Sequence, residues 1–266
     1  MTLPVFVINL DRRPDRWAAM SAQLDRLGIG AERIPAVDAR LLAAQEEEWG
    51  QGTDRGPPGC DLSSGEAACV WSHRKAMRAF LDTSERAALI LEDDAELAPD
   101  TPSLLESVDW WPPDARVIRL ETGIISPAKW CQLWPASAET PTGRRVHRFE
   151  RWTPGSAAYL VNREAAAFAL PHFDDPAMPM DTLLFDHRRS RLARELRALQ
   201  IVPGAARQAE DGETSDLSGW RTRRPRHTKW GKRNKKSLPY RVRLITLRCT
   251  GKVKKQRQGV YYRPAP

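Results

Sequence analysis

The apolar run at residues 87–91, AALIL, constrains the fold of this chain more than any other segment. A continuous apolar run of this length is typical of a strand that is covered on both faces, as in an α/β sheet. The run ends in three consecutive carboxylates, Glu92, Asp93 and Asp94. In open α/β sheets, ligands bind beyond the carboxyl ends of the strands. The segment therefore predicts a buried strand with a candidate site at its end.

The neighbouring segments predict strands that alternate with helices. An apolar strand at 5–10 is followed by a helix that begins at Pro14 and ends before Gly28. Ser63 and Glu66 have capping-box spacing and predict a helix to about residue 81. Further strands are expected at 33–37, 116–120, 145–149, 157–161 and 199–202, and further helices at 162–170, capped by Asn162, and 182–196. The expected fold is α/β, a mixed and mostly parallel sheet flanked by helices.

The three acidic residues suggest a metal site. Carboxylates at one strand end repel one another, and a hard divalent cation such as Mg²⁺ or Mn²⁺ relieves this repulsion while leaving positions open for substrate phosphates. Such a cation neutralises a diphosphate leaving group as a Lewis acid. The structural alternative is a solvated acidic turn before the helix expected near Thr101. The position directly after the apolar strand favours the functional interpretation.

Other candidate residues carry weaker signals. The residues after the first strand include three arginines that can fork onto phosphate oxygens, although basic residues in a first helical turn are usually solvated. His73 lies on an apolar helix face, where a hydrogen-bonded core histidine is the more frequent case. Asp181 stands at a helix start, either as an N-cap or as a general base that accepts a hydroxyl proton. Residues 50–60, rich in Gly and Pro, predict a loop that is either a lid or a connection.

The charge of the chain is divided unevenly. Residues 217–266 hold 17 Lys and Arg and no Asp or Glu, whereas residues 1–216 hold 25 bases and 34 acids. We therefore expect a main domain at 1–217 and a strongly basic extension at 218–266. The extension either meets an anionic surface such as a membrane leaflet or is a disordered, solvated tail. The sequence has no apolar stretch of 18 residues and no secretory leader pattern at its start. We expect a cytoplasmic protein, peripheral on the inner face of the cytoplasmic membrane.

Several motifs together resemble glycosyltransferase family 25, the lipopolysaccharide and lipooligosaccharide glycosyltransferases that include bacterial β-galactosyltransferases. The matching pieces occur in the order that the family has and cover residues 3–217. They are VFVINLDRRPDRW, RIPAVDA, LSSGEAACVWSHRKA, ALILEDDAEL, GSAAYLVNREAA, PMDTLLF, Gln208 and SDL at 215–217. Two departures are Ala39, where a glycine is common, and Ala67 with Ala68, where Ile-Gly is expected.

The resemblance implies a GT-A type nucleotide-sugar fold, a UDP-sugar donor, Mn²⁺ or Mg²⁺, and inversion at the anomeric carbon. Galactose is the commonest donor sugar implied, with a lipopolysaccharide or other surface glycan as acceptor. It implies Asp94 with Glu92 as metal ligands and Asp181 with Asp93 as catalytic residues. Because EDD is not a strict DxD motif, either Glu92 or Asp93 can join Asp94 at the metal. Implied donor-site residues are Asn9, Arg12, Arg16, Asp38, Glu66, Ser72, His73 and Glu92.

Two other classes of function remain as alternatives. A metal-dependent phosphoesterase would also use the acidic cluster with His73 and would consume simple phosphate esters. A nucleic-acid-binding protein that used the basic extension would bind DNA with an affinity that falls steeply as the salt concentration rises. The acidic main domain gives no obvious groove for a duplex.

Overall fold

The computed structural model describes residues 2–41, 62–121, 130–151, 154–209 and, near the C-terminus, 247, 250, 252 and 254–257. The predicted loop at 50–60, the motif at 215–217 and most of the basic extension lie outside the described residues. In chain order the helices and strands are β1 (Val5–Asn9), α1 (Pro14–Leu27), β2 (Glu32–Pro35), α3 (Ser64–Asp82), β3 (Ala87–Glu92), β4 (Ala95–Leu97), α4 (Thr101–Leu105), β5 (Val117–Arg119), β6 (Trp130–Glu139), β7 (Arg145–Arg151), β8 (Ala158–Asn162), α5 (Arg163–Ala169), the 3₁₀ helix η1 (Leu170–Phe173), α6 (Met180–Phe185), α7 (Arg191–Leu196), β9 (Leu199–Val202), β10 (Ala206–Gln208) and β11 (Lys254–Arg257).

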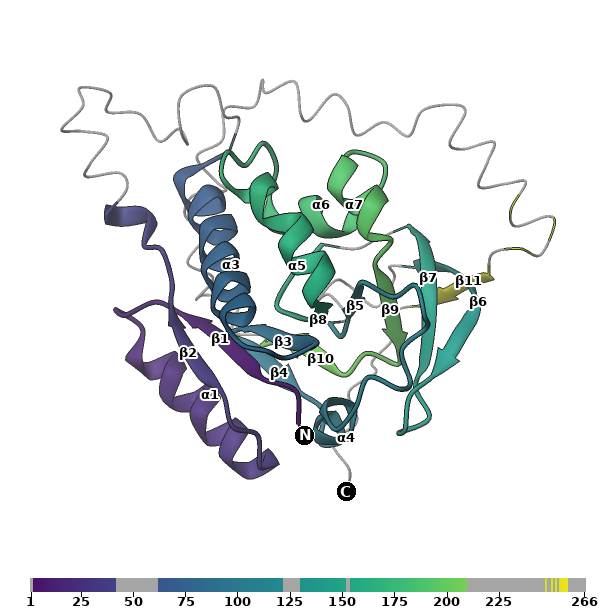
Figure 1. Ribbon diagram of the computed structural model, residues 1–266, viewed down its shortest axis with the longest axis horizontal. Coiled ribbons are helices and arrows are strands. Elements are labelled where there is room, and N and C mark those ends of the chain that lie inside the picture. The colour runs from purple at the N-terminus through teal and green to yellow at the C-terminus, as the bar shows by residue number, and fades with distance from the viewer. Residues whose placement is uncertain are drawn as a thin grey trace.

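The described strands form a large mixed sheet in the order β11-β6-β7-β9-β5-β8-β3-β1-β2, and β4 pairs with β10 in a small second sheet. The α/β fold with a mixed sheet flanked by helices is confirmed (Figure 1). Parallel pairs are β2-β1, β1-β3 and β5-β9. The other pairs in this sheet are antiparallel. The sheet therefore has more antiparallel pairs than the mostly parallel sheet that the sequence predicts. Short connections such as the turn at 140–144 between β6 and β7 allow only antiparallel pairing, because parallel neighbours need a crossover.

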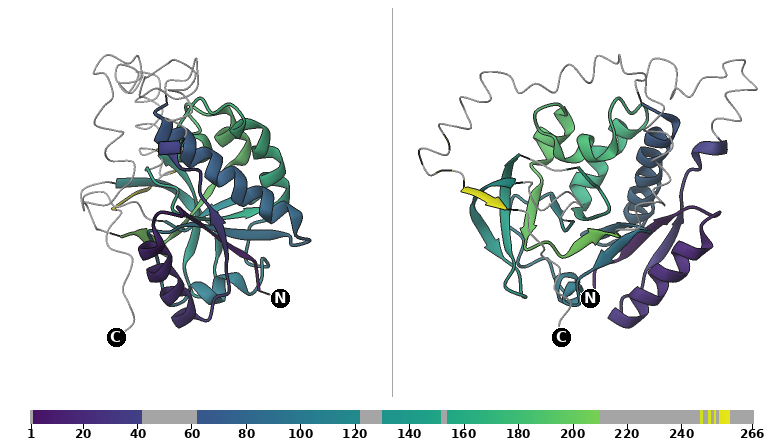
Figure 2. Two further views of the ribbon diagram at one scale, coloured as in Figure 1. Left: turned by 90° about the vertical axis from the view of Figure 1, so that its left-hand side faces the viewer. Right: turned by 180° about the vertical axis from the view of Figure 1, so that it is seen from behind.

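The side chains of β1 and β3 alternate between two apolar cores. On one face Val7 and Leu89 pack with residues of α1 and α4. On the other face Phe6 and Ile90 pack with residues of α3, α5, α6 and α7. Figure 2 shows helices on both sides of the sheet. Residues 87–91 are at most 1% exposed, so the prediction of a strand covered on both faces is confirmed.

The predicted helix ends are confirmed where capping signals were strong. Helix α1 starts at Pro14 and ends at Gly28, whose φ of 67° lies in the left-handed region that glycine adopts readily. Helix α3 has both halves of the Ser63–Glu66 capping box. Asn162 caps α5 through the Ala165 amide. Because these hydrogen bonds join residues close in the chain, short sequence motifs were sufficient to predict where the helices begin and end.

The single helix expected at 182–196 is a wrong prediction. The chain forms α6, a turn at 186–190 and α7 instead. Ser190 Oγ donates to the Leu183 carbonyl at 2.7 Å and accepts from the Ala193 amide at 3.0 Å, so it closes one helix and caps the next. Asp186 accepts from the Arg188 amide at 3.0 Å. Ser and Asp side chains compete with helical hydrogen bonds in this way.

The sheet continues into the predicted basic extension. Strand β11 pairs antiparallel with β6, with Lys254 opposite Leu133 and Gln256 opposite Cys131. Residues 254–257 therefore form the edge of the sheet beside β6. Among the helices that the structure describes, none has the length and apolar character to cross a bilayer.

The turn between α6 and α7 generates a prediction about stability. Ser190→Ala removes both a buried donor and a helix cap, so we expect unfolding free energy to fall by about 1–2 kcal/mol. Ser84→Ala is the matched control, because Ser84 is exposed between α3 and β3. This variant should change the free energy of unfolding by less than about 0.5 kcal/mol. Urea unfolding of both variants measures the difference. Equal free energies of unfolding for the two variants would contradict the role of Ser190 in ending α6 and capping α7.

Candidate functional site

The carboxyl ends of β1, β2 and β3 meet at one edge of the sheet. These strands are parallel, and Ile8 lies opposite Glu92 while Asn9 lies opposite Pro35. The acidic residues after β3 therefore lie beside the residues that follow β1. The solvated-turn alternative is not what the structure shows, since the side chain of Asp93 is 9% exposed and one Asp94 oxygen is buried. The cluster is an internal feature of this edge.

Asp93 faces the residues after β1. Its Oδ2 accepts from Asn9 Nδ2 at 2.7 Å, and its Oδ1 lies 3.1 Å from the Arg16 guanidinium. Asn9 is itself oriented by Arg33, whose Nε donates to Asn9 Oδ1 at 2.8 Å. Burial raises the pKa of Asp93, against the lowering effect of Asn9 and Arg16. This carboxylate thus joins β3 to the start of α1.

Asp94 is the least satisfied of the three carboxylates. Gln208 Nε2 on β10 donates to Asp94 Oδ2 at 3.1 Å. Asp94 Oδ1 is buried and has no hydrogen-bond partner among the described residues. Burial, followed by the charges of Glu92 and Asp93, raises the pKa of Asp94 to about 8. A buried acceptor without a donor is unfavourable, and a bound cation is the partner that would satisfy it.

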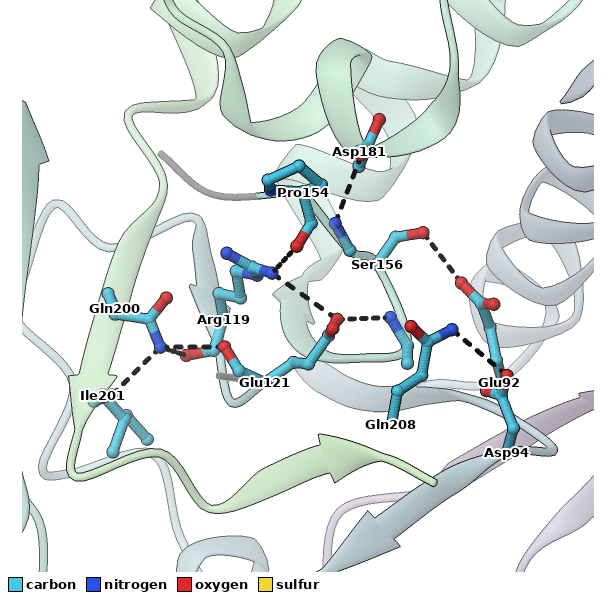
Figure 3. A network of polar contacts seen from close by, with 12 residues as sticks. Glu92, Asp94, Arg119, Glu121, Pro154, Ser156, Asp181, Gln200, Ile201 and Gln208 are labelled. Carbon is cyan, nitrogen blue, oxygen red and sulfur yellow. Dashed lines mark hydrogen bonds and ion pairs between the residues drawn. The ribbon is translucent and has the colours of Figure 1, made fainter. Parts of the chain in front are cut away.

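Glu92 connects the acidic cluster to Ser156, just before β8 (Figure 3), and to His73 on α3. Its Oε1 accepts from Ser156 Oγ at 2.8 Å and lies 3.3 Å from His73 Nε2. The other ring nitrogen of His73 lies 2.9 Å from the Tyr159 hydroxyl. His73 is buried, as a core histidine would be, but it also faces the functional cluster. Its orientation is fixed because both ring nitrogens have partners.

Two sets of potential metal ligands share Glu92. Asp94 Oδ1 and Glu92 provide hard oxygen atoms of the kind that Mg²⁺ and Mn²⁺ prefer. The ligand atoms of Cys69, His73 and Glu92 all lie within 4.8 Å of one another, a softer set better suited to Zn²⁺. The orphaned Asp94 oxygen favours the first set, so the expected ligands Asp94 and Glu92 fit a hard divalent cation.

The remaining residues expected at the donor site have different partners in the structure. Arg12 Nε donates to Asp38 Oδ2 at 2.8 Å, which links the segments after β1 and β2. Ser72 Oγ accepts from the Val37 amide at 2.9 Å and so ties α3 to the segment after β2. Glu66 Oε2 accepts from the amide and hydroxyl of Ser63, which gives this carboxylate a structural role at the start of α3.

Glu121, two residues after the end of β5, is a site residue that the sequence analysis missed. Its side chain is 0% exposed, and its Oε2 accepts from the Ala157 amide at 2.8 Å and lies 3.6 Å from Arg119. Its Oε1 has no hydrogen-bond partner among the described residues. Burial raises the pKa of Glu121 to about 7, with Arg119 lowering it and Glu92 raising it. The sequence signal that could have revealed Glu121 is the segment VIRLE at 117–121, a mostly apolar strand followed by an acidic residue. The end of β3 has the same pattern, with three carboxylates in place of one.

Asp181 lies in the first turn of α6 and is not its N-cap, a position held by Pro179. Its Oδ2 accepts from the Gly155 amide at 3.2 Å, and its Oδ1 accepts from the Thr182 hydroxyl at 3.2 Å. Burial raises the pKa of Asp181, opposed by the Gly155 and Thr182 hydrogen bonds and by the charge of Arg119. A carboxylate whose pKa is raised is a stronger base than a solvated one.

The comparisons with known proteins now identify the family. A model of "Glycosyltransferase family 25 (LPS biosynthesis protein)" matches residues 2–184. The chain belongs to glycosyltransferase family 25. The fold and the carboxylate cluster agree with the resemblance that the motifs indicated.

The relatives that it matches are longer than this chain. A "Glycosyltransferase 25 family member" of Drosophila melanogaster is 35% identical over 103 residues, which are 36% of this chain and 16% of that protein. "Procollagen galactosyltransferase 1" of Danio rerio is 36% identical over 95 residues, 34% of this chain and 16% of that protein. A solved glycosyltransferase involved in the glycosylation of the major capsid of PBCV-1 is 9% identical, with a TM-score of 0.43, and the likeness covers 84% of this chain and 98% of that one.

The buried Asp94 carboxylate generates a prediction about pH. Its pKa is raised in the folded state, so ionisation is easier in the unfolded chain and stability is lost as the pH rises from about 4 to about 8. Asp94→Asn lacks this loss, so in EDTA it should be more stable than the parent at pH 8, by about 1–3 kcal/mol, and closer to it at pH 5.

Urea unfolding at both pH values measures the effect, with Asp25→Asn on the exposed face of α1 as control. The account of Asp94 as an uncompensated buried carboxylate would be wrong if the variant were destabilised more at pH 8 than at pH 5.

Proposed function

We propose that this protein is a metal-dependent inverting glycosyltransferase that transfers a hexose from a UDP-sugar to a surface-glycan acceptor such as lipopolysaccharide. The observation that carries the proposal is the carboxylate cluster after β3 with its orphaned Asp94 oxygen, in a chain that belongs to family 25. Galactose is the proposed sugar, supported by the similarity to procollagen galactosyltransferase 1 of Danio rerio. The lipopolysaccharide acceptor is supported by the description of the family model.

Asp94 and Glu92 would hold Mn²⁺ or Mg²⁺ through oxygen atoms at the end of β3. When bound, the cation supplies Lewis-acid neutralisation of a diphosphate. Arg12 and Arg16 lie at the same edge with side chains 27% and 15% exposed, so both retain accessible surface beside their carboxylate partners. In the proposal they orient the donor phosphates.

Asp181 would act as the general base that takes the proton from the attacking acceptor hydroxyl. Its raised pKa and the Gly155 amide on one oxygen fit a carboxylate held ready in a fixed orientation. The acceptor oxygen would attack the anomeric carbon while the bond to the diphosphate breaks and UDP leaves from the opposite face, so the configuration inverts in a single displacement. Asp93, the other carboxylate expected to be catalytic, is occupied by Asn9 and Arg16 and would act by holding them in place.

UDP release from UDP-galactose tests the proposal. We expect release that requires Mn²⁺, stops in EDTA and falls by about 100-fold or more in Asp94→Asn, because the variant would lose the cation that neutralises the charge developing on the leaving diphosphate. Asp25→Asn, outside the site, should retain the parental rate.

The same assay separates the alternatives. An undiminished rate in EDTA or in Asp94→Asn would contradict the metal assignment. Hydrolysis of simple phosphate esters without cleavage of nucleotide sugars would instead favour the phosphoesterase.

The basic extension supports a proposed location on the inner face of the cytoplasmic membrane. Each Lys or Arg near an anionic leaflet contributes about 1 kcal/mol of attraction, so a dense run binds even when individual contacts are weak. We expect the full chain to sediment with anionic vesicles and not with neutral ones.

Replacing three basic residues by Gln in the extension should lower retention about 10-fold or more, whereas three replacements in the main domain should not. The two sets are Arg221, Arg223 and Arg224 for the extension, and Arg26, Arg78 and Arg86 for the main domain. Equal retention of both variants, or salt-dependent DNA binding with no vesicle binding, would contradict the membrane proposal.

A further inference from the structure

Four consecutive residues before β8, 154–157, lie between the donor-side carboxylates and Asp181. We call this segment the strap. Each strap residue bonds to a different charged side chain, and those side chains come from β3, from α6 and from β5 with the residues that follow it (Figure 3). The pairs are Pro154 O with Arg119 at 2.8 Å, Gly155 N with Asp181 at 3.2 Å, Ser156 Oγ with Glu92 at 2.8 Å, and Ala157 N with Glu121 at 2.8 Å.

The strap rests directly against Glu121. Gly155 has a φ of 117°, a conformation that residues with a side chain rarely adopt, and a Cβ at this position would overlap the Glu121 carboxylate. Glu121 therefore contacts the strap twice, at the Gly155 backbone and at the Ala157 amide. The side chain of Glu121 is 0% exposed, and its described contacts are with the strap and with Arg119.

The like charges around the strap explain why it needs to be held. The negative charges of Glu92 and Asp181 raise the pKa of Glu121, and the charge of Glu121 raises the pKa of Asp94. Without donors between them, these carboxylates would move apart. The strap supplies donors on three successive residues, so the covalent geometry of the backbone sets the spacing between carboxylates of β3, the end of β5, and α6.

We propose that Glu121 is a positioning residue for glycosyl transfer, which anchors the strap and thereby fixes Asp181 relative to Glu92. The inference rests on the proposed function for its catalytic consequence. Its structural part, that the strap loses its fixed position when Glu121 is removed, stands without any assumption about substrate. Two independent measurements can therefore test it.

Hydrogen exchange tests the structural part. In Glu121→Ala the Ala157 amide loses its acceptor, and we expect the amides of residues 155–157 to exchange at least about 10-fold faster, while the amides of β3 remain protected. Glu121→Gln retains an oxygen that can accept from Ala157 and should restore slow exchange. Glu121→Asp shortens the side chain and should resemble Glu121→Ala, which provides a second test if the alanine variant does not fold.

Steady-state kinetics with UDP-galactose and an acceptor glycan test the catalytic part. We expect Glu121→Ala to lower kcat by about 10–100-fold with the KM for the donor changed less than about 3-fold, because misplacing a catalytic group by about 1 Å has an effect of this size. Glu121→Gln should recover most of kcat. Glu150→Ala is the matched control, a buried glutamate of the same sheet that accepts from Trp134 Nε1 at 3.2 Å and lies outside the strap.

The outcomes separate this inference from the proposed function. Unchanged exchange of the strap in Glu121→Ala, or a glutamine variant as defective as the alanine variant, would overturn the inference. Loss of kcat in Glu150→Ala equal to that in Glu121→Ala would also overturn it, because any buried glutamate would then have the same effect. A parent protein that fails to use any nucleotide sugar would refute the proposed function, while the exchange experiment would still decide whether Glu121 anchors the strap.

Discussion

The structure depends on the burial of like-charged carboxylates at one edge of the sheet. Burial raises the pKa of Asp94 to about 8 and that of Glu121 to about 7, and one oxygen of each lacks a hydrogen-bond partner among the described residues. Such groups destabilise a folded chain unless donors or a cation compensate them. Carboxylates with strongly raised pKa values concentrate at functional sites, and the cation that we propose beside a diphosphate would compensate their charge.

The mixed sheet provides the geometry that brings these carboxylates together. Strand β8 runs antiparallel to both β3 and β5, with Ala158 opposite Leu91 and Tyr159 opposite Arg119. The amino end of β8 therefore begins where its two neighbours end, and the strap that leads into it lies between Glu92 and Glu121. In an all-parallel sheet this segment would lie at the opposite edge. The antiparallel strand thus has a direct consequence for the site.

The sequence predicted the features that depend on local hydrogen bonds and on periodicity. The buried β3 with its acidic end and the caps of α1, α3 and α5 followed from residues close in the chain or from the rule for strand ends. Glu121 was missed because its significance depends on Ala157 and Gly155, which are more than 30 residues away. The break at Ser190 was missed because its role needs the Leu183 carbonyl, a contact that helical periodicity does not encode.

The central claim is that the carboxylates after β3 bind a cation that in turn binds the diphosphate of an activated sugar. A crystal structure of the protein soaked with Mn²⁺ and UDP, with anomalous data to locate the metal, tests this most directly. The account predicts a manganese peak bound by Asp94 and Glu92, with UDP phosphate oxygens completing its coordination. A peak held by Cys69 and His73 without Asp94, or UDP bound elsewhere with these carboxylates unliganded, would contradict it.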